Sequence, residues 1–300
     1  SSGLQSIAHG ANAIMAGQSD VIVAGGIECA SWCPMTVVDL SSLDSYLFKN
    51  KPAVYTPMGM TAEILVDKAK EKLNIDITRE AMDAFALKSH QKASKAQKNG
   101  AFKKEIIPIT AVDKNGNLVV VTEDDCIRHD LTMEALENLA PAFKDGGTST
   151  AGNSSPMNDG AAFVVLMTRK KAKELGIKPI AKFLGFNVGG CHPAVMGIGP
   201  LFAIPKLLKR LLIRPNRFDV VELNEAFAAQ AIPCVDKVGF DHSKVNPRGG
   251  AIALGHPLGA TGAILTCRAL SQLEDTNGKL ALISMCIGGG MGGAGAFKRL

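Results

Sequence analysis

The chain has 300 residues, of which 46% are hydrophobic and 20% charged, and its formal net charge is +5. This composition excludes a disordered chain, and no apolar run reaches the roughly 18 residues that a membrane span needs. The basic excess is too small and too evenly spread for a nucleic-acid-binding stripe, but it fits an anionic small molecule.

The first part of the chain predicts a helix followed by a strand. Apolar residues recur at helical spacing over residues 2–17, and the helix is expected to end near Gly17. The next segment, 21–26, is continuously apolar. Such a run is typical of a strand that is covered on both faces, as in a parallel sheet.

Residues 31–150 differ in character from the segments around them and predict an inserted subdomain. Apolar residues at helical spacing predict helices over 62–73 and 82–96. A hairpin turn is predicted at 114–117, directly before a strand over 118–121.

From residue 158 onward, strands and helices alternate. Repeated strand–helix units predict an α/β architecture in which helices cover the sheets. The expected strands are 161–167, 180–188, 219–223 and 280–285. The expected helices are 169–175, 201–212, 261–273 and one that buries Phe227, Ala231, Val235 and Val238.

The seven cysteines indicate a reduced chain without a structural metal site. Their number is odd, and the sequence contains neither a CxxC pair nor a Cys/His cluster at zinc spacing. We therefore expect an intracellular protein that binds no metal.

His256 lies in the segment 249–260, which is rich in glycine and other small residues. Dense glycines let the backbone approach a ligand closely and leave an imidazole exposed at the turn before a helix. The alternative is a tight connection in which the histidine only caps a backbone group.

Cys286 stands at the end of the last predicted strand and is followed by glycines at 288–290, 292 and 293. A cysteine that faces consecutive glycine N–H groups can act as an acid or base beside an anion hole. The alternative is a buried core cysteine. The glycines at 290, 292 and 295 also satisfy GxGxxG, but they open no helix, so a dinucleotide site is excluded.

Asn224 is predicted at a junction between a strand and a helix. It could cap the helix, or it could direct its amide into a cleft at the carboxyl end of the strand. The segment 150–155 is by composition an ordinary polar loop.

Three segments together resemble the thiolase family of the acetyl-CoA acyltransferase kind. They are NEAF at 224–227, GGAIALGHPLGATGA at 249–263 and CIGGGMG at 286–292, and the resemblance covers essentially the whole chain. It implies an α/β fold with layered α-β-α-β-α architecture and an inserted loop subdomain. In thiolases the nucleophilic cysteine precedes a Ser-Gly-Leu-Gln segment with one residue between, and Ser2 to Gln5 match that segment.

The resemblance therefore implies that the nucleophile directly precedes Ser1. We expect an N-terminally truncated chain with an incomplete N-terminal half, which does not turn over alone. The implied organisation assigns 1–30 and 151–176 to the N-terminal half, 31–150 to a loop subdomain that covers CoA, and 177–300 to the C-terminal half.

The resemblance also implies catalytic roles for four residues. His256 takes the proton of the nucleophilic thiol, and Cys286 exchanges protons with acetyl-CoA or with CoA. Asn224, through a water, and His256 donate hydrogen bonds to the enolate oxygen. The N–H of Gly288 contributes to a second oxyanion hole.

Five further residues match binding positions of the family. Ser155 would contact the pantetheine arm of CoA and Arg128 its nucleotide end. Met58, Met196 and Phe227 would line the acyl pocket.

The implied reaction is the Claisen condensation of an acyl-CoA with acetyl-CoA, or thiolysis of a 3-oxoacyl-CoA, through an acyl-cysteine. CoA thioesters are the substrates, with no metal or redox cofactor and no nucleic-acid or membrane partner. Pro57 stands where many short-chain biosynthetic members have histidine, and Cys29 replaces a commoner serine, which favours a degradative enzyme. The full-length parent is expected to form a homodimer or homotetramer.

Two alternatives remain at this point. A non-catalytic protein that binds acyl-CoA or lipid would also keep the fold, and a 3-oxoacyl synthase would share the acyl-cysteine. The synthase completes its site with a second histidine, whereas Cys286 fits a thiolase better. Cytoplasm, mitochondrion and peroxisome are not distinguished by the sequence.

Overall fold

Strands from the C-terminal half form a four-stranded sheet in the order β5-β8-β7-β6. The computed structural model describes residues 1–33, 42–113 and 115–300. The β6 and β7 strands are parallel, and the other neighbours are antiparallel. The strands are β5 (Ala181–Gly190), β6 (Val220–Leu223), β7 (Leu280–Ile287) and β8 (Met291–Arg299).

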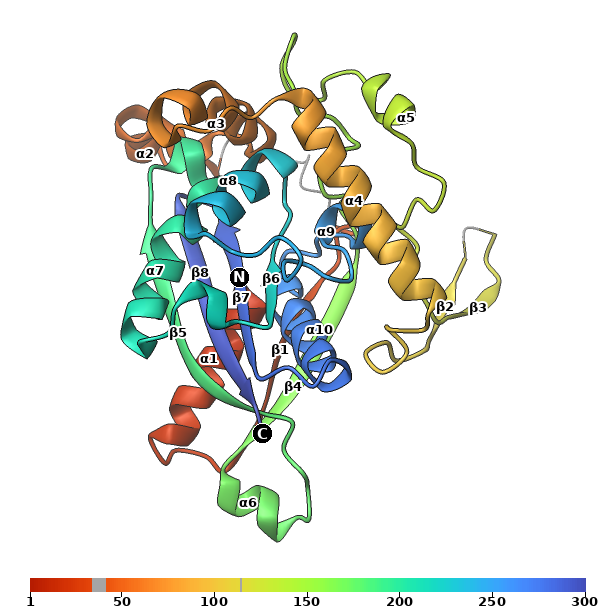
Figure 1. Cartoon of the computed structure of the whole chain (residues 1–300), viewed down its shortest axis with the longest axis vertical. Coiled ribbons are helices and arrows are strands. Elements are labelled where there is room, and N and C mark those ends of the chain that lie inside the picture. The colour runs from red at the N-terminus through yellow and green to blue at the C-terminus, as the bar shows by residue number, and fades with distance from the viewer. Residues whose placement is uncertain (34–41, 114) are drawn as a thin grey trace.

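Helices cover both faces of this sheet. Alternate side chains of a strand point to opposite faces, and on β7 both sets of side chains are largely apolar and buried. On β7, Leu282 packs with α7 (Pro200–Leu211) and α8 (Ala228–Val238). Its neighbours Ala281 and Ile283 pack with α1 (Ser2–Met15) and α10 (Thr261–Asp275). Figure 1 shows the sheet between these helices.

A second sheet lies on the far side of α1 and α10. It consists of β1 (Val21–Glu28) and β4 (Gly160–Met167), which are antiparallel. One face contributes Ala24 and Val164 to the core with α1 and α10. The prediction that strand 21–26 is covered on both faces as in a parallel sheet is wrong, because Val23, Phe163 and Val165 are exposed on the other face.

The strand β8 was not predicted from the sequence, in which the series of expected strands ends at 285 and only glycines are noted at 288–293. The glycines are needed because neighbouring elements approach β8 closely. A Cβ at Gly292 would collide with the backbone of Gly199, and one at Gly295 would lie 3.1 Å from the Leu4 side chain. Small residues therefore mark a packed strand here.

Between β1 and β4 the chain forms helices that pack over the C-terminal half. Side chains of α3 and α4 join Ala228, Ala229 and Ile252 in one apolar cluster. The hairpin prediction is confirmed by β2 and β3, although Lys114 lies outside the described residues. The elements are α2 (Ser45–Asn50), the 3-10 helix η2 (Pro52–Tyr55), α3 (Met58–Leu73), α4 (Arg79–Lys98), β2 (Ile109–Val112), β3 (Leu118–Val121) and α5 (Met133–Glu137).

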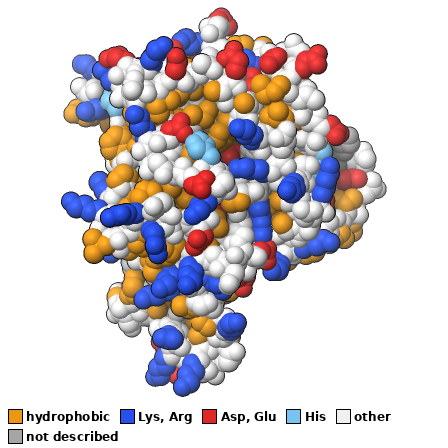
Figure 2. Space-filling model, in the orientation of Figure 1, with side chains coloured by type: hydrophobic (Ala, Val, Ile, Leu, Met, Phe, Trp, Pro, Cys, Tyr) orange, Lys and Arg blue, Asp and Glu red, His pale blue; other side chains and the backbone are white. Residues whose placement is uncertain are grey.

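The remaining elements are short. They are α6 (Arg169–Glu174), α9 (Ala251–Leu254) and the 3-10 helices η3 (Pro193–Ile198) and η4 (Pro215–Arg217). Within the described ranges, none of the helices combines the length and the apolar character that crossing a bilayer requires. Figure 2 shows Lys and Arg side chains scattered over one face of the molecule rather than gathered in one stripe.

Candidate active site

Asn224 and Cys286 lie at the same edge of the four-stranded sheet. The parallel strands β6 and β7 end at Leu223 and Ile287, and the N–H of Asn224 still bonds to the carbonyl of Ser284 at 2.9 Å. Carboxyl ends of parallel strands commonly carry ligand sites. Asn224 does not cap α8, which begins at Ala228 after Phe227.

The His256 ring faces Asn224. The Nδ2 atom of Asn224 lies 3.2 Å from His256 Nε2, and His256 Nδ1 lies 2.7 Å from Thr261 Oγ1. Burial lowers the pKa of His256 to about 4, so the ring is uncharged at neutral pH. The Asn224 Oδ1 atom is buried without a hydrogen-bond partner in the protein, which leaves it an acceptor for water or ligand.

Glycines allow the backbone to bring His256 to this position. Gly255 has a φ of +91°, and a Cβ there would collide with the Asn158 side chain. The His256 N–H bonds to the carbonyl of Pro156 at 3.3 Å. The one-turn helix α9 thus ends at a strained point where a side chain other than hydrogen would not fit.

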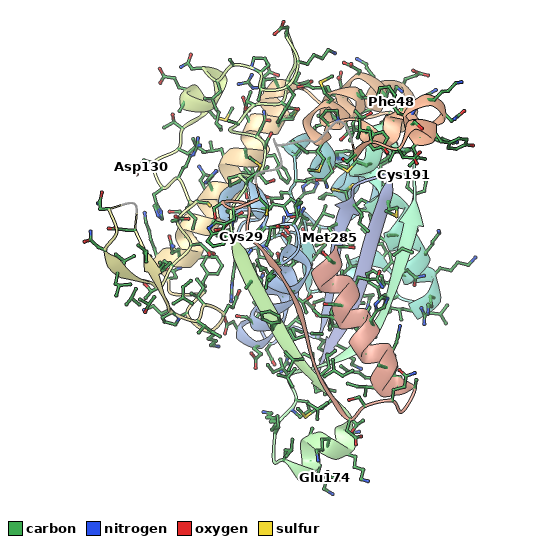
Figure 3. The ribbon with its side chains drawn as sticks, turned by 180° about the vertical axis from the view of Figure 1, so that it is seen from behind. Cys29, Phe48, Asp130, Glu174, Cys191 and Met285 are labelled. Atoms are coloured by element: carbon green, nitrogen blue, oxygen red, sulfur yellow. The ribbon has the colours of Figure 1, made fainter. Side chains whose placement is uncertain are left out.

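The thiol of Cys286 is buried at this edge, and burial raises its pKa to about 11. The start of α1 lies beside the end of β7, because Ser1 Oγ lies 3.3 Å from the place where a Cβ on Gly293 would stand, and Gly293 pairs with Met285. Figure 3 shows Met285, the neighbour of Cys286, near the same end of α1, and Met285 shares a core cluster with Leu4.

Three of the predicted pocket residues share a small apolar cluster with Cys286. Met58, Met196 and Phe227 pack around Cys286 and Ala226 in one small apolar cluster. These residues come from α3, η3, the segment before α8 and the end of β7. The structure therefore joins side chains that lie 228 positions apart, from Met58 to Cys286, in one apolar wall.

Gly288 lies in the turn between β7 and β8 and is exposed. A Cβ added there would meet no atom within 4 Å. The following Gly289 and Gly290 have φ values of +82° and +93°, which favour glycine. The turn at Gly288, two residues after Cys286, therefore has open space on the side where a Cβ would stand.

Ser155 lies beside the NEAF segment, whereas Arg128 does not. The N–H and the hydroxyl of Ser155 both donate to the carbonyl of Ala226, at 3.0 and 3.1 Å. Arg128 is exposed, and its N–H donates to His90 Nδ1 at 3.1 Å. Arg128 is not part of the cluster around Cys286.

A buried carboxylate next to Asn224 was not found from the sequence. Glu225 accepts hydrogen bonds from Ser89 Oγ at 2.6 Å, Asn246 Nδ2 at 2.7 Å and the N–H of Ile252 at 3.3 Å. It thereby ties α4 and α9 to the segment that carries Asn224. Its partner Ser89 lies 136 residues away, so spacing gives no signal for this contact.

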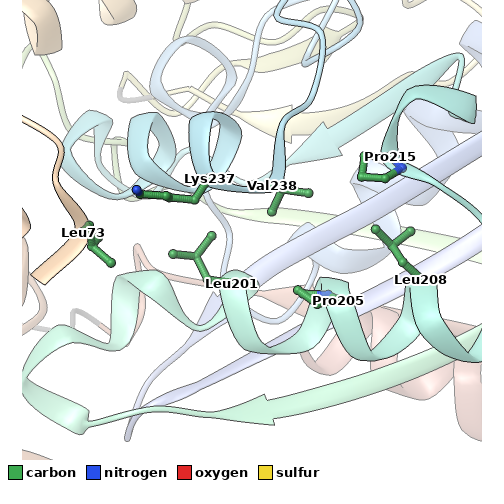
Figure 4. Close-up of a pocket in the computed structure, with 7 residues that line it drawn as sticks. All are labelled: Leu73, Leu201, Pro205, Leu208, Pro215, Lys237 and Val238. Atoms are coloured by element: carbon green, nitrogen blue, oxygen red, sulfur yellow. The ribbon is translucent and has the colours of Figure 1, made fainter.

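A concave pocket lies away from these residues. It has a volume of about 420 Å³, lies between α7 and α8 and is lined by apolar side chains with Lys237 (Figure 4). It contains none of the predicted site residues. Among the described residues, no group of three or more His, Cys, Asp or Glu side chains could hold a metal ion.

Known sequences and structures match this chain throughout. Residues 1–170 match the family "Thiolase, N-terminal domain" and residues 177–299 match "Thiolase, C-terminal domain". The chain is 45% identical over 306 residues to the 3-ketoacyl-CoA thiolase of Bacillus subtilis, covering 99% of this chain and 76% of that protein. It is 44% identical over 306 residues to peroxisomal 3-ketoacyl-CoA thiolase A of Mus musculus, covering 99% and 70%.

The fold agrees with these sequence matches. The crystal structure of the dimeric peroxisomal thiolase of Saccharomyces cerevisiae superposes with a TM-score of 0.89 at 40% identity, covering 100% of this chain and 74% of that one. The chain belongs to the thiolase family. It is an acyltransferase of the thiolase type, with the layered α/β fold of that family.

Proposed function

We propose that the protein acts on CoA thioesters, cleaving 3-oxoacyl-CoA with CoA and catalysing the reverse Claisen condensation. The observation that supports this most is the contact of Asn224 with His256 at the sheet edge where Cys286 ends β7. One site then holds a neutral imidazole, a neutral thiol and an amide. This combination suits proton transfer around a thioester carbonyl.

In the first half of thiolysis, the acyl-accepting thiol that the resemblance implies before Ser1 gives its proton to His256 Nε2. Its sulfur bonds to the 3-oxo carbon, and the bond between C2 and C3 breaks. Asn224 and the protonated His256 then stabilise the enolate oxygen of acetyl-CoA. Cys286 gives its proton to C2, a role that the raised pKa of its thiol favours because the resting side chain keeps that proton.

In the second half, the Cys286 thiolate takes the proton of a CoA thiol. The CoA sulfur attacks the acyl group and displaces the enzyme thiolate, which recovers its proton from His256. The N–H of Gly288 would stabilise the oxyanion of this step, and the turn has room for a ligand because a Cβ at Gly288 would meet no atom within 4 Å. Each side chain ends the cycle in its starting state, and no step requires a metal or a redox cofactor.

The binding roles are those that the family resemblance implies, and the positions of these residues support them. Met58, Met196 and Phe227 form the acyl-binding wall because they pack against Cys286. Ser155 is beside the catalytic segment and is assigned to the pantetheine arm, and Arg128 on the exposed side is assigned to the nucleotide end. The segment 31–150 is then the subdomain that covers CoA, between the N-terminal half (1–30, 151–176) and the C-terminal half (177–300).

The degradative direction is supported by the names of the relatives, several of which are called 3-ketoacyl-CoA thiolases. We assign a homodimeric or homotetrameric state because the yeast structure is described as dimeric. All seven cysteines are free, which supports a reducing, intracellular compartment.

The proposal is tested by the half-reaction that needs only residues of this chain, the exchange of acetyl-CoA methyl protons in D2O. The wild type should accelerate exchange over buffer, and Cys286→Ala should lower the rate at least about 100-fold, as expected for loss of an acid–base group. Cys267→Ser is the matched control, because burial raises the pKa of Cys267 to about 11 as well. Binding of CoA without any exchange would instead indicate a non-catalytic binding protein.

A further inference from the structure

Thr261 is the first residue of α10 and is buried beside His256. Its hydroxyl lies 2.7 Å from His256 Nδ1 and donates to the carbonyl of Pro257 at 2.8 Å. The side chain therefore stands between the imidazole and the turn that precedes the helix.

The positions of the hydrogens follow from what each group can donate. A hydroxyl has one hydrogen and a carbonyl oxygen can only accept, so a Thr261 hydroxyl that donates to Pro257 presents only its oxygen to His256 Nδ1. On the other side of the ring, Asn224 Nδ2 is a donor without acceptor capacity and lies 3.2 Å from Nε2. With the hydroxyl and the amide in these orientations, the hydrogen is on Nδ1 and the lone pair is on Nε2.

We propose that Thr261 is a positioning residue that holds His256 in the Nδ1–H tautomer and leaves Nε2 free to accept a proton. The inference deepens the proposed function and rests on it, because a base at Nε2 is what that function needs. Thr261 itself touches no reacting atom.

The tautomer matters here because the ring is uncharged. Burial lowers the pKa of His256 to about 4, so at neutral pH the two neutral tautomers compete. Only the Nδ1–H form can take a proton at Nε2. After it has done so, the Nδ1–H bond to Thr261 persists and the new Nε2–H can donate to an oxyanion.

The test compares hydroxyl removal at Thr261 with an equal change elsewhere on the same helix. Thr261→Val removes the hydroxyl at nearly constant shape, and Thr261→Ser retains it. Thr266→Val is the control, since Thr266 is fully buried and its hydroxyl donates to the carbonyl of Gly262 at 2.8 Å, also four residues back. Thr266→Val therefore loses the same kind of hydroxyl-to-carbonyl hydrogen bond as Thr261→Val, but among the described residues Thr266 has no hydrogen bond to a histidine.

The decisive readout is the ¹⁵N and ring-proton NMR pattern of His256, which distinguishes the two tautomers. The protein has six histidines, and the signal lost in His256→Gln identifies the one in question. Wild type, Thr261→Ser and Thr266→Val should show hydrogen on Nδ1. Thr261→Val should shift toward Nε2–H, because its Nδ1–H would be buried without an acceptor.

Activity gives the second readout. The rate of acetyl-CoA proton exchange should fall about 5- to 150-fold in Thr261→Val, the range for a buried donor left without a partner, and recover in Thr261→Ser. A wild-type ring with hydrogen on Nε2, or an unchanged Nδ1–H tautomer in Thr261→Val, would overturn the inference. Absence of exchange in a wild type that shows Nδ1–H would contradict the proposed function and leave the tautomer assignment standing.

Discussion

The reactivity of Cys286 toward an alkylating agent should depend on pH in a way that an ordinary thiol does not. Burial raises its pKa to about 11 from a usual 9.0. At pH 8 about one thiol in 1,000 is then ionised, against about one in ten without the shift, a difference of about 100-fold. A thiolate of higher pKa is also more nucleophilic, which returns roughly 6- to 10-fold and leaves a net deficit of at least about 10-fold.

The assay treats the folded protein with iodoacetamide between pH 6 and 10 and quantifies the Cys286 peptide by mass spectrometry. The same cysteine in urea-denatured chain is the reference. In the folded protein the rate should rise tenfold per pH unit across the whole range, whereas in the denatured chain it should level off near pH 9. A plateau below about pH 9.5 in the folded protein would refute the neutral resting thiol.

Two further changes probe the buried groups around the site. Burial raises the pKa of Glu222 to about 7 from 4.5, so the free energy of unfolding should fall as pH rises from about 4.5 to 7, by about 3 kcal/mol from this residue. Glu222→Gln should flatten that slope in urea titrations at several pH values, and an unchanged slope would contradict the assignment. Gly250→Ala would place a Cβ against the Glu225 carboxylate and should destabilise by about 1–3 kcal/mol. Gly190→Ala, whose Cβ has space, should cost much less in the same thermal unfolding measurement, and equal losses would count against the steric argument.

Sequence motifs single out Asn224, His256 and Cys286, whose catalytic roles remain predictions. The motifs around Asn224, His256 and Cys286 identify the side chains that the structure brings to one sheet edge. A glycine requirement contributes to the signal around His256, because the preceding residue, Gly255, has a positive φ that favours glycine.

The sheets were harder to predict because a continuously apolar run does not show whether one face of a strand or both faces are buried. Residues 21–26 indicate a fully covered strand, but Val23 is 66% exposed. Conversely, the glycines of β8 conceal a central strand, since close packing there requires the absence of a side chain. Long-range contacts, such as Ser89 with Glu225, have no local signature at all.

Asn224 and Cys286 are proposed to act on the same enolate, Asn224 at its oxygen and Cys286 at its C2 atom, and a double-mutant cycle tests this most directly. Proton exchange of acetyl-CoA is measured for Asn224→Ala, Cys286→Ala and the double variant, after each is shown to unfold cooperatively. Residues that act as a unit are strongly non-additive. We expect the double variant to be about as slow as Cys286→Ala alone. Effects that multiply would show that the two side chains act independently, and would contradict a single active site.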